Sequence, residues 1–229
     1  MKKILSMLLV LCMALTLCSA AFAEGKSPVD GMTVAFIPKV SGNSFFEAAN
    51  DGAQKYAADW GLTVDYIGAP TADVTTQLEL IQQAIDKGVD AICISSVDAT
   101  GLDEKLQEAQ DAGIYVSTWD SDVSPNARAL MVSQGTADVL GPMLVDMAVE
   151  SLKERGVDVN GEVKYVWHFS NPSVSDQNSW YVAGDAYIKE KYPSWVAVHD
   201  PYYSNQDPAQ SVSVGESILD AYADVDVII

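Results

Sequence analysis

The sequence predicts an α/β protein made of two lobes, each a doubly wound parallel sheet covered by helices, with a hinge between them. Continuous apolar runs such as residues 89–95 are typical of strands buried on both faces. These runs alternate with segments of helical periodicity such as residues 74–87, which is the order of βα units. The same plan restarts near residue 135. We therefore expect an amino-terminal lobe at residues 24–134 and an incomplete carboxy-terminal lobe at residues 135–229.

The elements of the first lobe follow from apolar runs and from the residues that punctuate them. The expected strands are residues 33–38, 62–67, 89–95, 114–118 and 129–132, and the expected helices are residues 44–60, 74–87 and 98–113. Gly88 is a typical residue after a helix end. Asp98 or Thr100 is expected to cap the third helix, which Gly113 ends.

The second lobe repeats this order after a crossing near residues 133–136. The expected helices are residues 137–155, 178–192 and 209–222, and the expected strands are residues 163–169, 195–200 and 225–229. Ile228 and Ile229 have the character of the middle of a buried strand. We therefore expect the chain to be a fragment of a longer protein.

The first 23 residues have the layout of a cleaved signal peptide. Two lysines precede an apolar stretch at residues 4–17, which is too short to span a bilayer comfortably, and small residues lead to a cleavage site after Ala23. A lipid-modified Cys18 is the alternative, but the bulky Leu17 before it argues against that. The sequence predicts an exported protein, in the periplasm or on the outer face of the cytoplasmic membrane.

Composition excludes several classes of function. A formal net charge of −19 repels nucleic-acid phosphates and anionic lipid head groups, so nucleic-acid and membrane-surface roles are disfavoured. Removal of the leader leaves about 200 residues, enough for two lobes of roughly 100 residues each. Cys93 is then the one remaining cysteine, so no intrachain disulfide forms, and its apolar neighbours predict a buried, inert thiol.

Signatures of catalysis and of cofactor binding are missing from the sequence. There is no glycine-rich phosphate loop and no serine in a nucleophile-elbow context. His168 and His199 have no cysteine or glutamate at ligand spacing, which makes a zinc site improbable. We expect a protein that is not an enzyme and needs no cofactor or metal.

Polar and charged residues at predicted strand ends are the candidate binding residues, because ligands of open α/β sheets lie outside these ends. Lys39 and Asp120 follow strands of the first lobe, and Asp176 and Gln177 lie between a strand and a helix of the second. The alternatives are a surface lysine for Lys39, a turn or helix cap for Asp120, a helix cap for Asp176 and a solvated side chain for Gln177. One lysine and two acids in a closed cleft leave a net charge of about −1, which favours a neutral polyhydroxylated ligand.

Aromatic residues near these positions are candidates for the apolar walls of a sugar-sized site. Phe45, Phe46, Trp119 and Trp180 are the four. Core packing is the alternative for each of them.

Several stretches resemble the periplasmic sugar-binding proteins of the ribose-binding type, and most closely the Lsr-type autoinducer-2-binding proteins. They are VAFIPK at residues 34–39 with Gly42 and the following phenylalanines, TWDSD at 118–122, QGT at 134–136, GPMLVDMA at 141–148 and SDQNSW at 175–180. The similarity runs from about residue 32 to residue 229. It implies the type I periplasmic-binding-protein fold and a monomeric substrate-binding component that delivers its ligand to the permease of an ABC importer.

The resemblance also implies a ligand and a set of contacts. The family's contact positions match Lys39, Asp120, Asp176 and Gln177, and a proline and an alanine of the family's site fall beyond Ile229. The implied ligand is the boron-free, cyclised and hydrated form of autoinducer-2. The alternatives are rhamnose, ribose or another monosaccharide, a sensor ectodomain with the same cleft, and a sugar-processing enzyme built on the same lobes.

Overall fold

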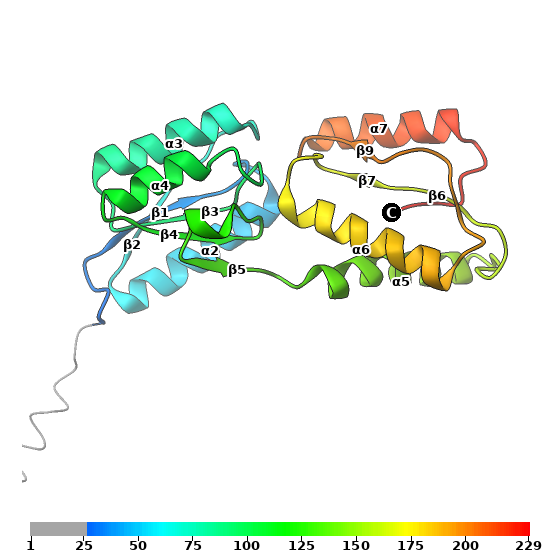
Figure 1. The fold of residues 1–229 in the computed structure, drawn as a ribbon, viewed down its shortest axis with the longest axis horizontal. Coiled ribbons are helices and arrows are strands. Elements are labelled where there is room, and N and C mark those ends of the chain that lie inside the picture. Colours follow the sequence, from blue (N-terminus) through cyan, green and yellow to red (C-terminus); the bar gives the residue numbers. More distant parts are fainter. Residues whose placement is uncertain (1–26) are drawn as a thin grey trace, which may run out of the picture.

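The computed structural model describes residues 27–229 of the chain. The predicted signal peptide and Cys18 lie outside these residues. Two groups of strands, each with helices on both sides, follow one another along the long axis of the molecule (Figure 1). No helix within residues 27–229 is long and apolar enough to cross a membrane.

The first group is a five-stranded parallel sheet in the order β2-β1-β3-β4-β5. Its elements are β1 (Thr33–Ile37), α2 (Ser44–Trp60), β2 (Thr63–Tyr66), α3 (Val74–Lys87), β3 (Ala91–Ile94), α4 (Asp103–Asp111), β4 (Tyr115–Trp119), the 3-10 turn η2 (Pro125–Ala127) and β5 (Leu130–Val132). Helices α3 and α4 cover one face of the sheet and α2 covers the other (Figure 1). The prediction of a doubly wound α/β fold is confirmed.

The second group has shorter strands and two small parallel sheets, in the orders β10-β6-β8 and β7-β9. Its elements are α5 (Ala137–Glu154), β6 (Lys164–Val166), β7 (His168–Phe169), α6 (Ser175–Lys191), β8 (Val196–Ala197), β9 (Tyr202–Tyr203), α7 (Pro208–Ala221) and β10 (Val227–Ile228). Helices α5 and α6 lie on one side of these strands and α7 lies on the other (Figure 1).

Two predicted strands of the second lobe are broken in the structure. The strand predicted at residues 163–169 is divided into β6 and β7, and the strand predicted at 195–200 is only β8, followed by the unpredicted β9. Pro201 lies between β8 and β9 and has no N–H to donate to a neighbouring strand. The N–H of Val198 still donates to the carbonyl of Tyr165 before Pro201, and the N–H of Tyr202 donates to the carbonyl of Trp167 after it.

The start of α4 also differs from the prediction. Neither Asp98 nor Thr100 caps it, because the helix begins at Asp103 after Leu102, which makes no side-chain cap bond. The Asp98 carboxylate instead accepts hydrogen bonds from the N–H groups of Thr100 and Gly101, at 3.0 and 2.8 Å. The Asp98 side chain therefore stabilises a local turn before the helix and does not cap the helix as predicted.

Each group of strands has its own apolar core. The larger cluster lies between the five-stranded sheet and helices α3 and α4 and includes Ile37, Ile81 and Ile94, all fully buried. A separate cluster around Val163 and Trp167 packs the second group against α5 and α6. Separate cores agree with the two-lobe fold, and the division at residues 134 and 135 remains our proposal.

Helices α5 and α6 approach each other closely at two glycines. A Cβ atom on Gly141 would lie 2.5 Å from the carbonyl oxygen of Trp180 and 2.6 Å from the backbone nitrogen of Gly184. These are backbone atoms, which cannot move aside as a side chain can. The contact fixes how α6, which carries the predicted site residues Asp176, Gln177 and Trp180, lies on α5.

We expect Gly141→Ala to lower the free energy of unfolding by about 1–3 kcal/mol, because the added methyl group overpacks the helix contact. Denaturant unfolding followed by circular dichroism measures this. Gly215→Ala is the matched control, because nothing lies within 4 Å of its Cβ position in α7. That variant should be more stable by about 0.5–1 kcal/mol. Equal stability of Gly141→Ala and wild type would contradict the close packing.

Candidate functional site

The carboxyl ends of β1, β3 and β4 bring three polar residues together at one edge of the first sheet. Lys39 follows β1, Ser95 follows β3 and Asp120 follows β4. All three are buried, with Lys39 only 3% exposed and Asp120 only 7% exposed. Parallel strands that lie side by side end at the same edge, which is why residues far apart in sequence meet here.

Lys39 forms an ion pair with one carboxylate from each half of the chain. Its Nζ lies 2.9 Å from Oδ2 of Asp120 and 3.1 Å from Oδ2 of Asp176. Asp176 is itself only 8% exposed. A buried charge is stable only when it is paired, so the lysine compensates two carboxylates that would otherwise repel each other.

The Asp120 carboxylate is held by two further side chains that were not among the predicted site residues. The Ser95 hydroxyl donates to its Oδ2 at 2.6 Å, and the Gln134 amide donates to its Oδ1 at 3.0 Å. Asp120 also has a φ of 61°, in the left-handed region that aspartate tolerates better than most residues. The local backbone and its hydrogen bonds together fix where this carboxylate points.

Asp176 reaches the same place from the first turn of α6. The helix begins at Ser175, three residues before the predicted start, and the residue before it is Val174. Asp176 is therefore not a helix cap, and its charge lies near the positive end of the helix dipole. Its Oδ1 is buried and has no hydrogen-bond partner among the described residues. The site thus contains an unused acceptor.

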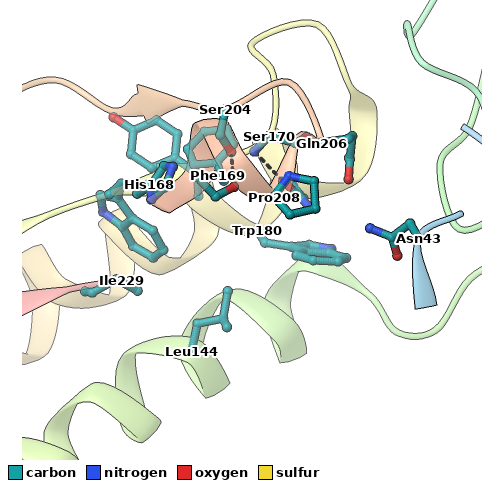
Figure 2. Close-up of a pocket in the computed structure, with 14 residues that line it drawn as sticks. Asn43, Leu144, His168, Phe169, Ser170, Trp180, Ser204, Gln206, Pro208 and Ile229 are labelled. Atoms are coloured by element: carbon teal, nitrogen blue, oxygen red, sulfur yellow. Dashed lines mark hydrogen bonds between the residues drawn. The ribbon is translucent and has the colours of Figure 1, made fainter. Parts of the chain in front are cut away.

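Gln177 and Trp180 line a cavity rather than the ion cluster. The cavity has a volume of about 640 Å³ and lies in the second half of the chain, with Asn43 contributed by the first (Figure 2). The side-chain oxygen of Gln177 accepts from the N–H of Ser170 at 2.8 Å, which orients the amide at the cavity wall.

Lys39, Asp120 and Asp176 are not among the residues that line this cavity. A second hollow, of about 400 Å³, lies between residues 40–43 and 70–72 of the first lobe and residues 205–208 of the second. In the ion cluster, the ammonium group of Lys39 lies between the carboxylates of Asp120 and Asp176. The predicted site residues are consequently found in two neighbouring groups, one an ion cluster and one a cavity wall.

The predicted aromatic residues also separate into two groups. Phe46 and Trp119 are buried in a small cluster with Val40, and Trp119 stacks on Phe36 at 4.7 Å between ring centroids. Phe45 is half exposed, with its ring 6.3 Å from that of Trp119. Core packing thus accounts for Phe46 and Trp119.

Among residues 27–229, no group of histidine, cysteine, aspartate and glutamate side chains has the arrangement of a metal site. Burial lowers the pKa of His168 below its usual range. Burial also raises the pKa of the Cys93 thiol, which keeps it protonated and unreactive at neutral pH.

Gln77 of α3 bonds to the backbone at the ends of the strands that carry the site, and this role was not predicted. It is 1% exposed, its amide nitrogen donates to the carbonyls of Pro38 and Ser95, and its oxygen accepts from the N–H of Val97. These bonds join the ends of β1 and β3 immediately beside Lys39. A lone glutamine inside a helical pattern carries no signal that could have revealed this role.

Comparison with known proteins shows similarity to a periplasmic binding family and to sugar-binding proteins. Residues 34–229 match the family model described as periplasmic binding protein domain. Among curated proteins, the chain is 28% identical over 132 residues to the D-ribose/D-allose-binding protein of Pseudomonas aeruginosa, an alignment that covers 55% of this chain and 41% of that protein. It is 31% identical over 121 residues to the multiple sugar-binding periplasmic receptor ChvE of Rhizobium radiobacter, covering 52% of this chain and 32% of that protein.

Two solved structures are similar along most of the chain. LsrB from Clostridium saccharobutylicum in complex with AI-2 has a TM-score of 0.85 and 56% identity, covering 86% of this chain and 61% of that one. A solute-binding protein of Clostridium phytofermentas with bound L-rhamnose has a TM-score of 0.79 and 25% identity, covering 86% and 59%. The chain therefore spans less than two thirds of the length of these relatives.

We expect Gln77→Leu to lower the free energy of unfolding by about 3 kcal/mol, because two carbonyls and one N–H lose their buried partner. Gln83→Leu on the exposed side of the same helix is the matched control and should stay within about 0.5 kcal/mol of wild type. Denaturant unfolding measures both. A Gln77 variant as stable as its control would show that these hydrogen bonds contribute little.

Proposed function

Because the chain belongs to the periplasmic binding protein domain family, we propose that it is an exported solute-binding protein of an ABC importer that captures autoinducer-2 between its lobes. The observation that supports this most is the ion cluster of Lys39, Asp120 and Asp176, which joins the two halves of the chain. The family resemblance implies that these three residues are ligand contacts. The similarity to LsrB, whose structure contains AI-2, supports the choice of ligand.

The charges of the cluster suit an uncharged ligand rich in hydroxyl groups. An ionised carboxylate can accept hydrogen bonds from two adjacent hydroxyls, and each such bond contributes about 1.5–3 kcal/mol. Asp176 already offers a buried oxygen that has no hydrogen-bond partner within residues 27–229. Two carboxylates and one ammonium give the cluster a net charge of about −1, which disfavours an anionic borate ester. We therefore assign the boron-free, cyclised and hydrated form of the signal.

Gln177 and Trp180 are proposed to contact the same ligand from the cavity side. A volume of about 640 Å³ falls within the ordinary range of small-molecule pockets. The Trp180 ring, labelled in Figure 2, would supply an apolar wall, and the Gln177 amide would supply a polar contact. Phe45, half exposed with its ring 6.3 Å from that of Trp119, is a further candidate wall.

Closure of the lobes is proposed to signal that ligand is bound. Asp120 and Asp176 belong to different lobes, so a ligand that bonds to both stabilises the closed state over the open one. The permease can then recognise the closed shape of a monomeric binding protein. In this proposal the protein returns its ligand chemically unchanged and is not an enzyme.

A monosaccharide is the second candidate ligand. The curated relatives are described as binders of ribose, allose and other sugars, and one solved relative holds L-rhamnose. A sugar presents the same kind of vicinal hydroxyls to the same carboxylates. Calorimetric titration of the full-length protein with autoinducer-2, ribose and rhamnose distinguishes the two, and binding of a sugar but not of the signal would reject the first proposal.

We expect Asp120→Asn and Asp176→Asn each to weaken binding of autoinducer-2 by about 2–4 kcal/mol, because an amide is a poorer acceptor than a carboxylate and leaves Lys39 incompletely paired. Isothermal titration calorimetry measures the change. Asp51→Asn, on the exposed side of α2, is the control and should bind as wild type does. Unchanged affinity in both cluster variants would mean that the ligand binds elsewhere.

A further inference from the structure

The two lobes are also joined by hydrogen bonds that involve none of the proposed ligand contacts. The hydroxyl of Ser175 accepts from the N–H of Asp122 at 2.8 Å and donates to the carbonyl of the same residue at 3.0 Å. Beside it, the N–H of Ala99 donates to the carbonyl of Ser173 at 3.0 Å. The start of α6 therefore lies directly against the first lobe, as Figure 1 also shows.

We propose that Ser175 is a positioning residue that latches the closed state and sets how long the ligand stays bound. This inference rests on the proposed function for its ligand, but not for its geometry. Ser175 immediately precedes Asp176 in the first turn of α6. Anchoring Ser175 to the backbone of Asp122 holds the Asp176 carboxylate within reach of Lys39, at 3.1 Å.

The partner of the latch in the first lobe is firmly held. The Asp122 carboxylate accepts two hydrogen bonds from Arg128, at 3.0 and 2.7 Å, and one from the hydroxyl of Thr118. Burial acts to raise the pKa of Asp122, but the bonds from Arg128 and Thr118 outweigh it, and the pKa lies below its usual range. With its side chain fixed in this way, the backbone of Asp122 presents its N–H and carbonyl to Ser175 in one orientation.

The loop that carries Ser175 is braced as well. The side-chain nitrogen of Asn178 donates to the carbonyls of Asn171 and Val174, at 2.9 and 2.6 Å, and the side-chain oxygen of Asn171 accepts from the N–H of Ser173 at 2.8 Å. Val174 lies between Ser173 and Ser175, which both bond to the first lobe, and it is 2% exposed. Both sides of the latch are thus arranged by bonds within their own lobe, so little order has to be gained when they meet.

A latch without ligand contacts changes binding through the equilibrium between open and closed forms. The apparent affinity of a closing receptor scales with the fraction of molecules in the binding-competent state. Contacts formed only in the closed state also slow its opening, and a slower opening lengthens the residence of the ligand.

Small-angle X-ray scattering of the ligand-free full-length protein tests the latch, together with stopped-flow dissociation of autoinducer-2. We expect Ser175→Ala to increase the radius of gyration, to weaken binding about tenfold and to do so mainly through faster dissociation. Ser175→Thr retains the hydroxyl and should restore both values toward wild type. Ser194→Ala is the matched control, because that hydroxyl donates to the carbonyls of Asn160 and Gly161, both in the second lobe.

Two results would overturn the latch. One is a Ser175→Ala protein with the same radius of gyration and dissociation rate as Ser194→Ala. The other is equal loss in Ser175→Thr and Ser175→Ala. Should Ser175→Ala fail to fold, Ser175→Cys, which keeps the size but has a weak donor, is measured instead. If the wild type binds no autoinducer-2, the proposed function fails, while the scattering of the ligand-free variants still decides whether the latch exists.

Discussion

The rest of this site depends on one buried ammonium group between two carboxylates. Lys39 and its two partners are almost fully removed from water, and a charge in that environment is tolerated only beside opposite charges. This pairing requirement constrains the geometry of the fold. The ends of β1 and β4 must lie at one sheet edge, and α6 must begin where its first turn can reach them. Ser95 and Gln134 then fix the carboxylate of Asp120 against the lysine.

Sequence predicts the helices best where their ends carry local signals. Residues 44–60 and 74–87 were predicted with the bounds that the structure shows. The structure shows that both helices have local end signals, with Asn43 and Asp73 as caps at the starts and glycines after the ends. The start of α6 was misplaced by three residues for the opposite reason. Val174 supplies no side-chain cap, and the hydroxyl of Ser175 bonds to Asp122 in the other lobe, a partner that no local pattern reveals.

The site residues also divide into those that the sequence indicates and those that depend on tertiary packing. Lys39, Asp120 and Asp176 follow from strand ends together with the family resemblance, and the structure brings these three together. The residues that hold them in place could not be predicted, because Gln77 reaches its partners only after α3 packs against a face of the sheet. The cavity was equally hidden, since its wall is assembled from segments that lie far apart in the chain.

A ligand that enters this cluster must compete with Lys39 for carboxylates that the lysine already compensates. An anionic ligand would bring a third negative charge to one ammonium, whereas a neutral polyol can add hydroxyl donors, beginning at the unpaired Oδ1 of Asp176, without breaking the ion pairs. The cluster and the Ser175 contact both depend on the first turn of α6. The start of α6 therefore couples the proposed ligand contact of Asp176 to the contact between Ser175 and Asp122 of the other lobe. A change in one of these contacts should alter the strength of the other.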